Sequence, residues 1–142
     1  MNDIKTKMDF VVDANILISA LISIEGKTCD LLFDDKLKLY SPEFLITEIE
    51  KHKDEILGKA DISESELNLF LLLVFSRINL IPYDEFKECA EEARRISPDI
   101  NDTEYFALAL KFNCPIWSND KKLKEQNKII AYSTQEVINL LS

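Results

Sequence analysis

The sequence predicts an α/β fold in which a parallel sheet is covered by helices on both faces. Short runs rich in β-branched residues alternate with segments of helical periodicity along the chain, and this alternation is typical of parallel sheets. Hydrophobic residues make up 46% of the 142 positions, enough to build a core without disulfide or zinc staples. No internal repeat or low-complexity tract divides the chain. We therefore expect a single domain over residues 1–142, with residues 1–8 as a short N-terminal extension.

Strands are expected where apolar, β-branched residues are bounded by polar or turn-forming residues. Five such runs occur, at residues 10–12, 37–41, 80–82, 114–117 and 128–131. Helical patterns fill the intervals, at residues 16–21, 28–34, 42–56, 63–75, 84–95 and 101–112, followed by a short Lys-rich helix from 119 or 120 and a terminal helix from 133. Pro42 suits the first turn of its helix. Ser63 with Glu66, and Ser133 with Glu136, form capping boxes at two other helix starts.

The helix expected over residues 63–75 is apolar on every side between residues 69 and 75. A helix of this kind is buried either in the core or against a second copy of the chain. We therefore expect a homodimer whose interface includes Leu69, Phe70 and Leu73.

Charge and glycine content exclude several classes of function. The chain has 17 Lys and Arg against 26 Asp and Glu, which gives a formal charge of −9. A field of this sign repels nucleic acid, so any role on nucleic acid would need bound cations. The two glycines, Gly26 and Gly58, cannot build a G-x-G-x-x-G dinucleotide turn or a G-x-x-x-x-G-K-[ST] phosphate loop.

Cysteine spacing and hydropathy predict a cytoplasmic protein without membrane association. Cys29, Cys89 and Cys114 are odd in number and contain no C-x-x-C pair, which argues against a disulfide framework and a cysteine zinc site. The apolar stretch near the N-terminus is interrupted by Asp13 and Asn15, so it fits neither a signal peptide nor a membrane span.

Acidic residues stand where a parallel sheet places its ligand site, beyond the carboxyl ends of the strands. Asp13 follows the first expected strand and Asp120 follows the fourth, and these ends are neighbours if the strand order is 3-2-1-4-5. Glu48 and Asp102 lie on the apolar faces of their expected helices, because the residues one turn away are hydrophobic. The sequence therefore directs four carboxylates inward.

Four carboxylates cannot all stay ionised in a dry pocket, because desolvation and mutual repulsion raise their pKa values. A hard divalent cation such as Mg²⁺ or Mn²⁺ resolves this conflict, since it takes oxygen ligands and bridges to phosphate. The reaction class that follows is metal-assisted hydrolysis of a phosphodiester.

Four motifs in order carry a family resemblance. They are V-V-D-A-N at 11–15, F-L-I-T-E-I at 44–49, D-I-N-D-T-E-Y-F-A-L-A-L at 99–110 and P-I-W-S-N-D at 115–120. Each is weak alone, but together they cover most of residues 9–131 with a specific order and spacing. On these motifs the sequence resembles the PIN-domain nucleases.

The resemblance implies a three-layer α/β/α sandwich with five parallel strands in the order 3-2-1-4-5. It implies cleavage of RNA that depends on Mg²⁺ or Mn²⁺. The catalytic and metal-binding residues that it implies are Asp13, Glu48, Asp102 and Asp120, with Asn15, Ser118 and Asp99 in support. Small members of this family resemble the toxin half of a toxin–antitoxin pair and form homodimers, so an antitoxin is an expected partner beside RNA. Asn101 departs from the pattern, because an acid often stands there, and this weakens the case for a second metal.

The same polar residues have simpler interpretations. Asp13 and Asp120 could cap the helices that follow them, and Asp102 could be the third helical residue in a capping arrangement with Asp99. The lysines after the last acid could bind phosphate or RNA beside the metal, or could form a solvated basic face. These lysines are Lys121, Lys122 and Lys124.

Other functions are less well supported by the residues present. A haloacid-dehalogenase-like phosphatase, also metal-dependent, needs a second acid where Asn15 stands, and a response-regulator receiver needs an aspartate where the third strand ends in I-P-Y at 81–83. His52, the single histidine, has no identifiable partner for a nucleophilic device. A non-catalytic PIN-fold binding module, or an RNA-processing factor, is the main alternative to a toxin-like endoribonuclease.

Overall fold

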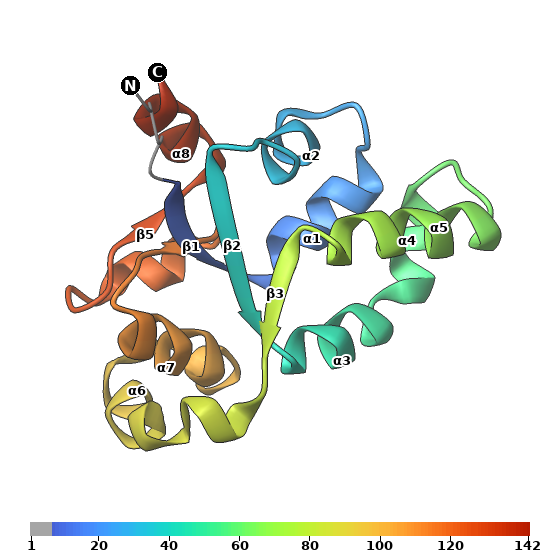
Figure 1. Cartoon of the computed structure of the whole chain (residues 1–142). Helices are drawn as coiled ribbons and strands as arrows, with labels where there is room; N and C mark the ends of the chain where they lie inside the picture. Colours follow the sequence, from blue (N-terminus) through green and yellow to red (C-terminus); the bar gives the residue numbers. More distant parts are fainter. Residues whose placement is uncertain (1–6) are drawn as a thin grey trace.

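The computed structural model of the chain describes residues 7–142, and its strands form one five-stranded parallel sheet (Figure 1). The order is β3-β2-β1-β4-β5, which confirms the predicted topology. The strands are β1 (Met8–Val12), β2 (Leu37–Pro42), β3 (Ile78–Ile81), β4 (Ile116–Trp117) and β5 (Ala131–Tyr132). Residues 1–6 of the predicted N-terminal extension lie outside the described residues, and Met8 already belongs to β1.

Helices connect the strands and cover both faces of the sheet. The α-helices are α1 (Ala14–Ile22), α2 (Lys27–Leu32), α3 (Phe44–Lys51), α4 (Lys53–Lys59), α5 (Glu64–Phe75), α6 (Ala90–Ile96), α7 (Thr103–Phe112) and α8 (Thr134–Leu141). Short 3₁₀ helices are η1 (Tyr83–Glu85), η2 (Lys87–Cys89), η3 (Ile100–Asp102) and η4 (Lys121–Glu125). Within the described part of the chain, no helix is long and apolar enough to cross a membrane.

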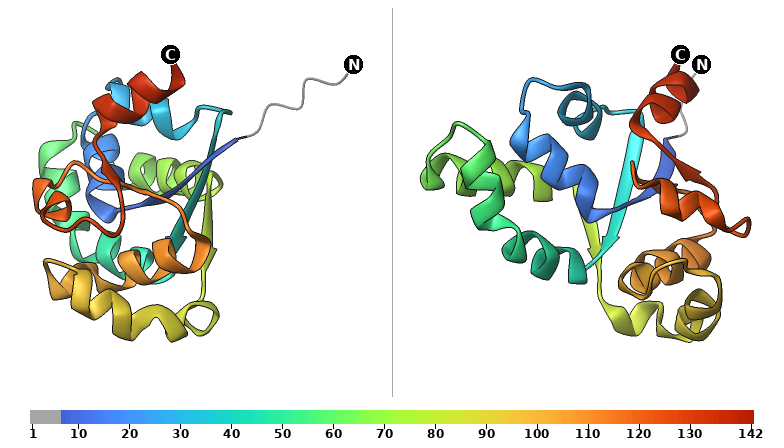
Figure 2. Two further views of the ribbon diagram at one scale, coloured as in Figure 1. Left: turned by 90° about the vertical axis from the view of Figure 1, so that its left-hand side faces the viewer. Right: turned by 180° about the vertical axis from the view of Figure 1, so that it is seen from behind.

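The helices form two layers with the sheet between them, as the predicted sandwich requires. α1 packs against α2, α3, α4 and α5, whereas α7 packs against β1, β2 and β4 and is backed by α6. Figures 1 and 2 show these two groups on opposite sides of strands β1 to β3. The largest fully buried side chains include Trp117, Tyr105 and Phe10.

Two predicted boundaries around α3 are wrong. Pro42 does not open a helix; it is the last residue of β2, where it pairs with Ile81 of β3. The helix predicted over residues 42–56 is interrupted at His52, whose backbone (φ −101°, ψ 6°) ends α3 and begins α4. The imidazole of His52 lies 3.0 Å from the carboxylate of Glu55 in the next turn.

The elements near the C-terminus are shorter than predicted. The fourth strand begins only after Pro115, which has no N–H to contribute to a ladder. Most of the run at 128–131 is a loop, because the Gln126 side chain binds backbone groups of Leu123, Lys128 and Ile129. The predicted Lys-rich helix is the 3₁₀ helix η4, and the helices predicted at 84–95 and 101–112 also begin with 3₁₀ turns.

Helix α5 is apolar but only partly buried. The capping box of Ser63 and Glu66 is confirmed, as is the one that opens α8. Leu67, Leu71 and Val74 face the core, whereas the opposite face presents three exposed leucines. These are Leu69, Leu72 and Leu73, with exposed fractions of 62%, 70% and 50%. Burial of the whole segment in the core is therefore wrong.

Candidate metal centre

β1 and β4 bring two polar side chains together at the carboxyl edge of the sheet. The last two residues of β1 pair with the two residues of β4, so the residues that follow, Asp13 and Ser118, are neighbours. The Ser118 hydroxyl donates a hydrogen bond of 2.7 Å to Oδ2 of Asp13. The two strand ends singled out in the sequence therefore meet.

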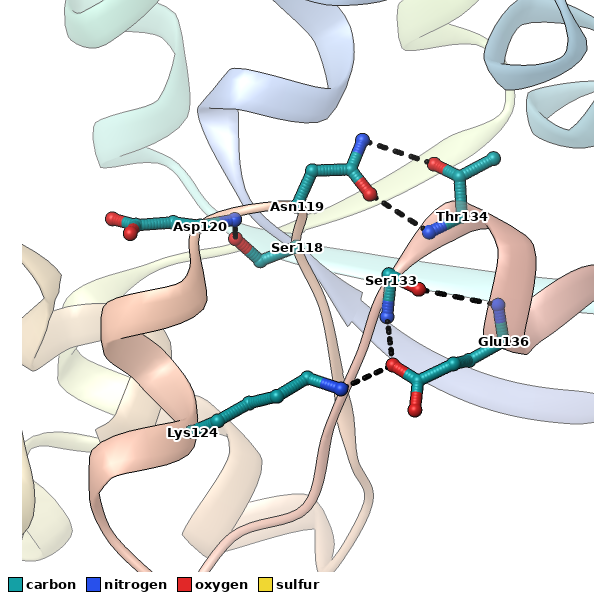
Figure 3. Close-up of polar contacts among 7 residues, drawn as sticks. All are labelled: Ser118, Asn119, Asp120, Lys124, Ser133, Thr134 and Glu136. Carbon is teal, nitrogen blue, oxygen red and sulfur yellow. Dashed lines mark hydrogen bonds and ion pairs between the residues drawn. The ribbon is translucent and has the colours of Figure 1, made fainter.

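Ser118 connects three of the predicted site residues. Its Oγ accepts a hydrogen bond of 3.3 Å from Nδ2 of Asn15 and one of 3.1 Å from the backbone N–H of Asp120. Figure 3 shows the second of these contacts at the start of η4. The hydroxyl thus fixes Asp13, Asn15 and Asp120 relative to one another.

Asp13 is a buried carboxylate that does not cap a helix. Its exposed fraction is 6%, and burial raises the pKa of its carboxyl, while the hydrogen bond from Ser118 and the amides of Asn15 and Ala14 oppose the shift. It stands at the N-cap position of α1, and no side-chain capping hydrogen bond is present there, although the amides of Ala14 and Asn15 lie close enough to favour its charged form. Its charge is therefore available for another partner.

Asp102 shows that the acids share one electrostatic environment. Burial, together with the negative charges of Asp13, Asp99, Asp120 and Glu48, raises the pKa of its carboxyl to about 7. It also stands at an N-cap position, that of α7, without a capping hydrogen bond. The fold thus gathers the four predicted ligands close enough for their charges to interact.

Two of the acids do serve as caps. Asp99 accepts a hydrogen bond of 2.9 Å from the N–H of Asn101, and Asp120 accepts one of 3.0 Å from the N–H of Lys122. Capping therefore explains Asp99 and Asp120, but it does not explain Asp13 or Asp102. Asp120 can still bind a cation, because a carboxylate has a second oxygen.

Glu48 lies on α3 with its side chain mostly buried. The ammonium group of Lys51, one turn later on the solvent side, is 3.9 Å from its carboxylate. An exposed contact at this distance contributes little, so Glu48 remains available to a stronger partner.

Tyr105 is a polar residue of the site that the sequence indicated only as an apolar neighbour of Asp102. Its ring is buried, and within the described residues its hydroxyl has no hydrogen-bond partner. Burial and the charges of Asp13, Glu48 and Asp102 raise its pKa far above the usual value, so the phenol keeps its proton. The signal in the sequence was a phenol one helical turn after a predicted ligand.

The donor set fits a hard cation although it does not enclose one as it stands. Among residues 7–142, no three Asp, Glu, His or Cys side chains are already arranged to hold a metal. The available atoms are oxygens, their charges repel one another, and two buried polar atoms, the Tyr105 hydroxyl and Oδ1 of Asn15, lack partners in the described part. Mg²⁺ and Mn²⁺ accept such oxygens and keep several waters, so they need few protein ligands.

Comparison with known proteins shows the family. The model of the PIN domain matches residues 11–137, which is most of the chain. The chain belongs to the PIN-domain family. This is the family of nucleases that the four sequence motifs indicated, and all of those motifs lie within the matched residues.

The chain is also similar to a curated protein in sequence and to solved structures in fold. The uncharacterized protein MJ1680 of Methanocaldococcus jannaschii is 30% identical over 135 residues, which cover 89% of this chain and 81% of that protein. The fold is similar to that of a chain in the crystal structure of VapBC2 from Rickettsia felis bound to a DNA fragment of the VapBC2 promoter. The TM-score is 0.65 at 15% sequence identity, and the match covers 89% of this chain and 98% of that chain. The fold is also similar to that of PAE2754 from Pyrobaculum aerophilum, with a TM-score of 0.62 at 19% sequence identity. This match covers 94% of this chain and 89% of that chain.

The predicted phosphate-binding lysines of this PIN domain differ in their surroundings. Lys124 makes an ion pair with Glu136 of α8, so it joins η4 to α8 (Figure 3). Lys121 and Lys122 are exposed at the start of η4, next to Asp120. A contact with phosphate is therefore expected from these two lysines rather than from Lys124.

Proposed function

We propose that the chain is an endoribonuclease that hydrolyses RNA phosphodiester bonds with Mg²⁺ or Mn²⁺. The observation that carries the proposal is the meeting of β1 and β4 at the carboxyl edge of a PIN-domain sheet, where the Ser118 hydroxyl binds the carboxylate of Asp13 and the backbone N–H of Asp120. The residues that would hold the cation are Asp13, Glu48, Asp102 and Asp120. A divalent cation supplies a Lewis acid that lowers the pKa of water and offsets the charge of the phosphate.

The side chains around these ligands would orient them for the reaction. Ser118 binds Oδ2 of Asp13 and leaves Oδ1 without a side-chain donor. The Tyr105 phenol would donate a hydrogen bond to a water or an acid oxygen in the site, because it has no protein partner in the described residues. Lys121 and Lys122 would offset the charge of the RNA backbone.

Metal-dependent cleavage of a complex RNA pool tests the proposal whichever RNA is the target. Wild type, Asp13→Asn and Asp102→Asn are incubated with total RNA in Mn²⁺ or in EDTA, and new 5′ ends are sequenced. Asp9→Asn is the matched control, because Asp9 is exposed on the same strand that leads to Asp13. We expect cleavage by wild type and the control in Mn²⁺ alone. Equal cleavage by Asp13→Asn, with its fold verified by circular dichroism, would contradict the proposal.

A non-catalytic PIN-fold module is the second candidate. It is favoured by one observation, that no three acidic side chains of residues 7–142 already surround a cation position. This candidate, or an RNA-processing factor of narrow specificity, would bind RNA and leave the total pool uncut. Cleavage of the pool that requires both Mn²⁺ and Asp13 would exclude the non-catalytic module.

We also propose that the chain is the toxin of a toxin–antitoxin pair. The likeness of its fold to VapBC2 supports this proposal. A partner could silence the site by placing an arginine among the acids, because a guanidinium binds carboxylates in bidentate pairs. Expression of wild type would then arrest growth, whereas Asp13→Asn would not. Equal growth with both proteins would contradict a toxic activity.

A homodimer through α5 is proposed from the exposed leucines of that helix, whereas Phe70, which was predicted in the same interface, is half-buried and packs edge-on against Phe33. Leu69, Leu72 and Leu73 form a stripe that has Asn68 and Ser65 as its uncharged neighbours. In a chain with a charge of −9, two copies approach with least repulsion where a face carries no charge. Leu72→Lys should give a monomer in light scattering, whereas Ile130→Lys, at an isolated exposed position, should leave the mass unchanged.

A cytoplasmic location and a single domain over the whole chain are also proposed. Cys29, Cys89 and Cys114 are free thiols, which suits the reducing cytoplasm. One sheet and one hydrophobic core cluster include residues from β1 to α8, which supports a single domain.

A further inference from the structure

A hollow with a volume of about 360 Å³ opens beside the acidic residues. Its walls come from α3, η1, α6, η3 and the first turns of α7. Asn101 and Thr103, on either side of Asp102, line it, and Phe44 lines it one helical turn before Glu48. Its volume lies in the range of pockets that hold small molecules. The hollow is therefore a neighbouring feature of the candidate metal centre, and it contains none of the proposed ligands.

The walls of this hollow present exposed apolar side chains, the cation Arg94 and one carboxylate, that of Glu104. Tyr83 is 45% exposed, and its ring packs edge-on against buried Phe86 with centroids 5.5 Å apart. Phe86 therefore fixes the ring while leaving part of it open. Ile100, which also lines the hollow, is 78% exposed. The Arg94 guanidinium makes no hydrogen bond or ion pair with any residue in the described range.

We propose that this hollow binds one nucleotide of single-stranded RNA, next to the phosphate that is cleaved, with its base against Tyr83 and its phosphate at Arg94. The inference rests on the proposed nuclease function and adds a place where the substrate is recognised. Unpaired bases stack on aromatic side chains, and every base offers such a face. A guanidinium suits phosphate because its planar fork donates two parallel hydrogen bonds.

A second hollow on the other side of the acids is less suited to the same role. It has a volume of about 500 Å³ and is lined by residues 118–120 after β4, which include the proposed ligand Asp120, by Lys121 and Lys124 of η4, and by the start of α8. The Asn119 amide is already paired with Thr134, donating at 3.1 Å and accepting at 2.8 Å, and Lys124 is paired with Glu136 (Figure 3). These groups hold η4 against α8. Lys121 also offers a cation in this second hollow, but of the two hollows, as the described residues line them, only the first has an open aromatic ring, that of Tyr83.

The test compares two oligomers that carry the same charge. A fluorescent ten-nucleotide single-stranded RNA and an abasic ribose-phosphate oligomer of the same length are titrated with the protein in Ca²⁺, and a gel verifies that the RNA is intact. The variants are Tyr83→Ala, Tyr83→Phe and Arg94→Gln. Arg95→Gln is the matched control, because Arg95 is exposed on the same helix but does not line the hollow.

We expect Tyr83→Ala to weaken binding of the RNA by at least about fivefold, the lower end for loss of one stacked base. The same variant should bind the abasic oligomer as wild type does, and Tyr83→Phe should bind both oligomers normally. Arg94→Gln should weaken both oligomers, and Arg95→Gln neither. Equal effects of Tyr83→Ala on both oligomers, or no effect on either, would overturn the proposal, as would equal effects of the two arginine variants.

This result can be separated from the fate of the nuclease proposal. If wild type cleaves RNA in Mn²⁺ and all variants bind RNA as wild type does, the hollow is not a nucleotide site and the nuclease function stands. If wild type cleaves nothing but Tyr83→Ala selectively loses RNA binding, the hollow is a nucleotide site on a non-catalytic module.

Discussion

Replacing Asp102 with Asn should stabilise the cation-free protein at alkaline pH, although it removes a proposed ligand. The change keeps the size of the side chain and deletes one of several mutually repelling charges. In the fold, burial and the charges of four neighbouring acids raise the pKa of this carboxyl from 3.8 to about 7. Because this pKa is higher in the folded state than in the unfolded chain, the free energy of unfolding falls as pH rises from 3.8 to about 7. Above about pH 7 this destabilisation is fully present.

The size of the effect follows from the same interval. A difference between 3.8 and about 7 corresponds to about 4 kcal/mol at 1.36 kcal/mol for each pH unit. Asp102 is only partly buried, so solvent screening reduces this value to about 1–2 kcal/mol. For a chain of this length, about 1 kcal/mol shifts Tm by roughly 3 °C. We therefore expect Asp102→Asn to raise Tm by about 3–6 °C at pH 8.

Thermal unfolding in EDTA at pH 8 and pH 5 measures this effect. The gain should be smaller at pH 5, because the folded wild type then keeps its proton on Asp102 and part of the repulsion is absent. Asp84→Asn is the control, since Asp84 is an exposed acid outside the cluster, and it should leave Tm unchanged at both values. A lower Tm for Asp102→Asn at pH 8, or the same gain at both pH values, would refute the electrostatic reasoning.

Three further outcomes are expected. Tyr105→Phe removes a buried hydroxyl without a partner, so in EDTA it should leave the free energy of unfolding unchanged or raise it by up to about 1 kcal/mol. The same variant should bind Mn²⁺ more weakly in a thermal titration. A loss of stability in EDTA would show that the hydroxyl already has a partner. Ser118→Ala deletes the hydrogen bond to the buried carboxylate of Asp13, so it should lower the free energy of unfolding by about 1–2 kcal/mol and raise the pKa of Asp13 further. Chemical denaturation measures the first effect and NMR titration the second. Addition of EDTA to an active preparation should stop RNA cleavage, and Mn²⁺ should restore it; cleavage that continues in EDTA would contradict a role for the cation.

The sequence located the acids because their positions follow from simple periodicities. Asp13 and Asp120 come directly after strands, and parallel strands place such residues at one edge of the sheet. Glu48 and Asp102 follow from helical spacing. The sequence could not distinguish caps from free carboxylates, since Asp99 and Asp120 stand at helix starts just as Asp13 and Asp102 do, and side-chain torsions decide which of them reaches a backbone N–H.

Other features depended on long-range packing that no local pattern carries. Tyr105 comes under the charges of Asp13, which follows β1, and Glu48 of α3 only because α7 packs on the sheet. The loop before β5 follows from one side chain, that of Gln126, which binds backbone groups of Leu123, Lys128 and Ile129. Helix α5 looked buried on every side, but the fold covers just one of its faces.

Thermal unfolding during Mn²⁺ titration of wild type, Asp13→Asn and Asp9→Asn tests the metal centre most directly. A ligand at 100 times its Kd stabilises the folded state by roughly 2.7 kcal/mol. We expect saturable stabilisation of wild type and Asp9→Asn, and none of Asp13→Asn. An equal shift in all three proteins, or no shift in wild type, would contradict a cation site at the gathered acids.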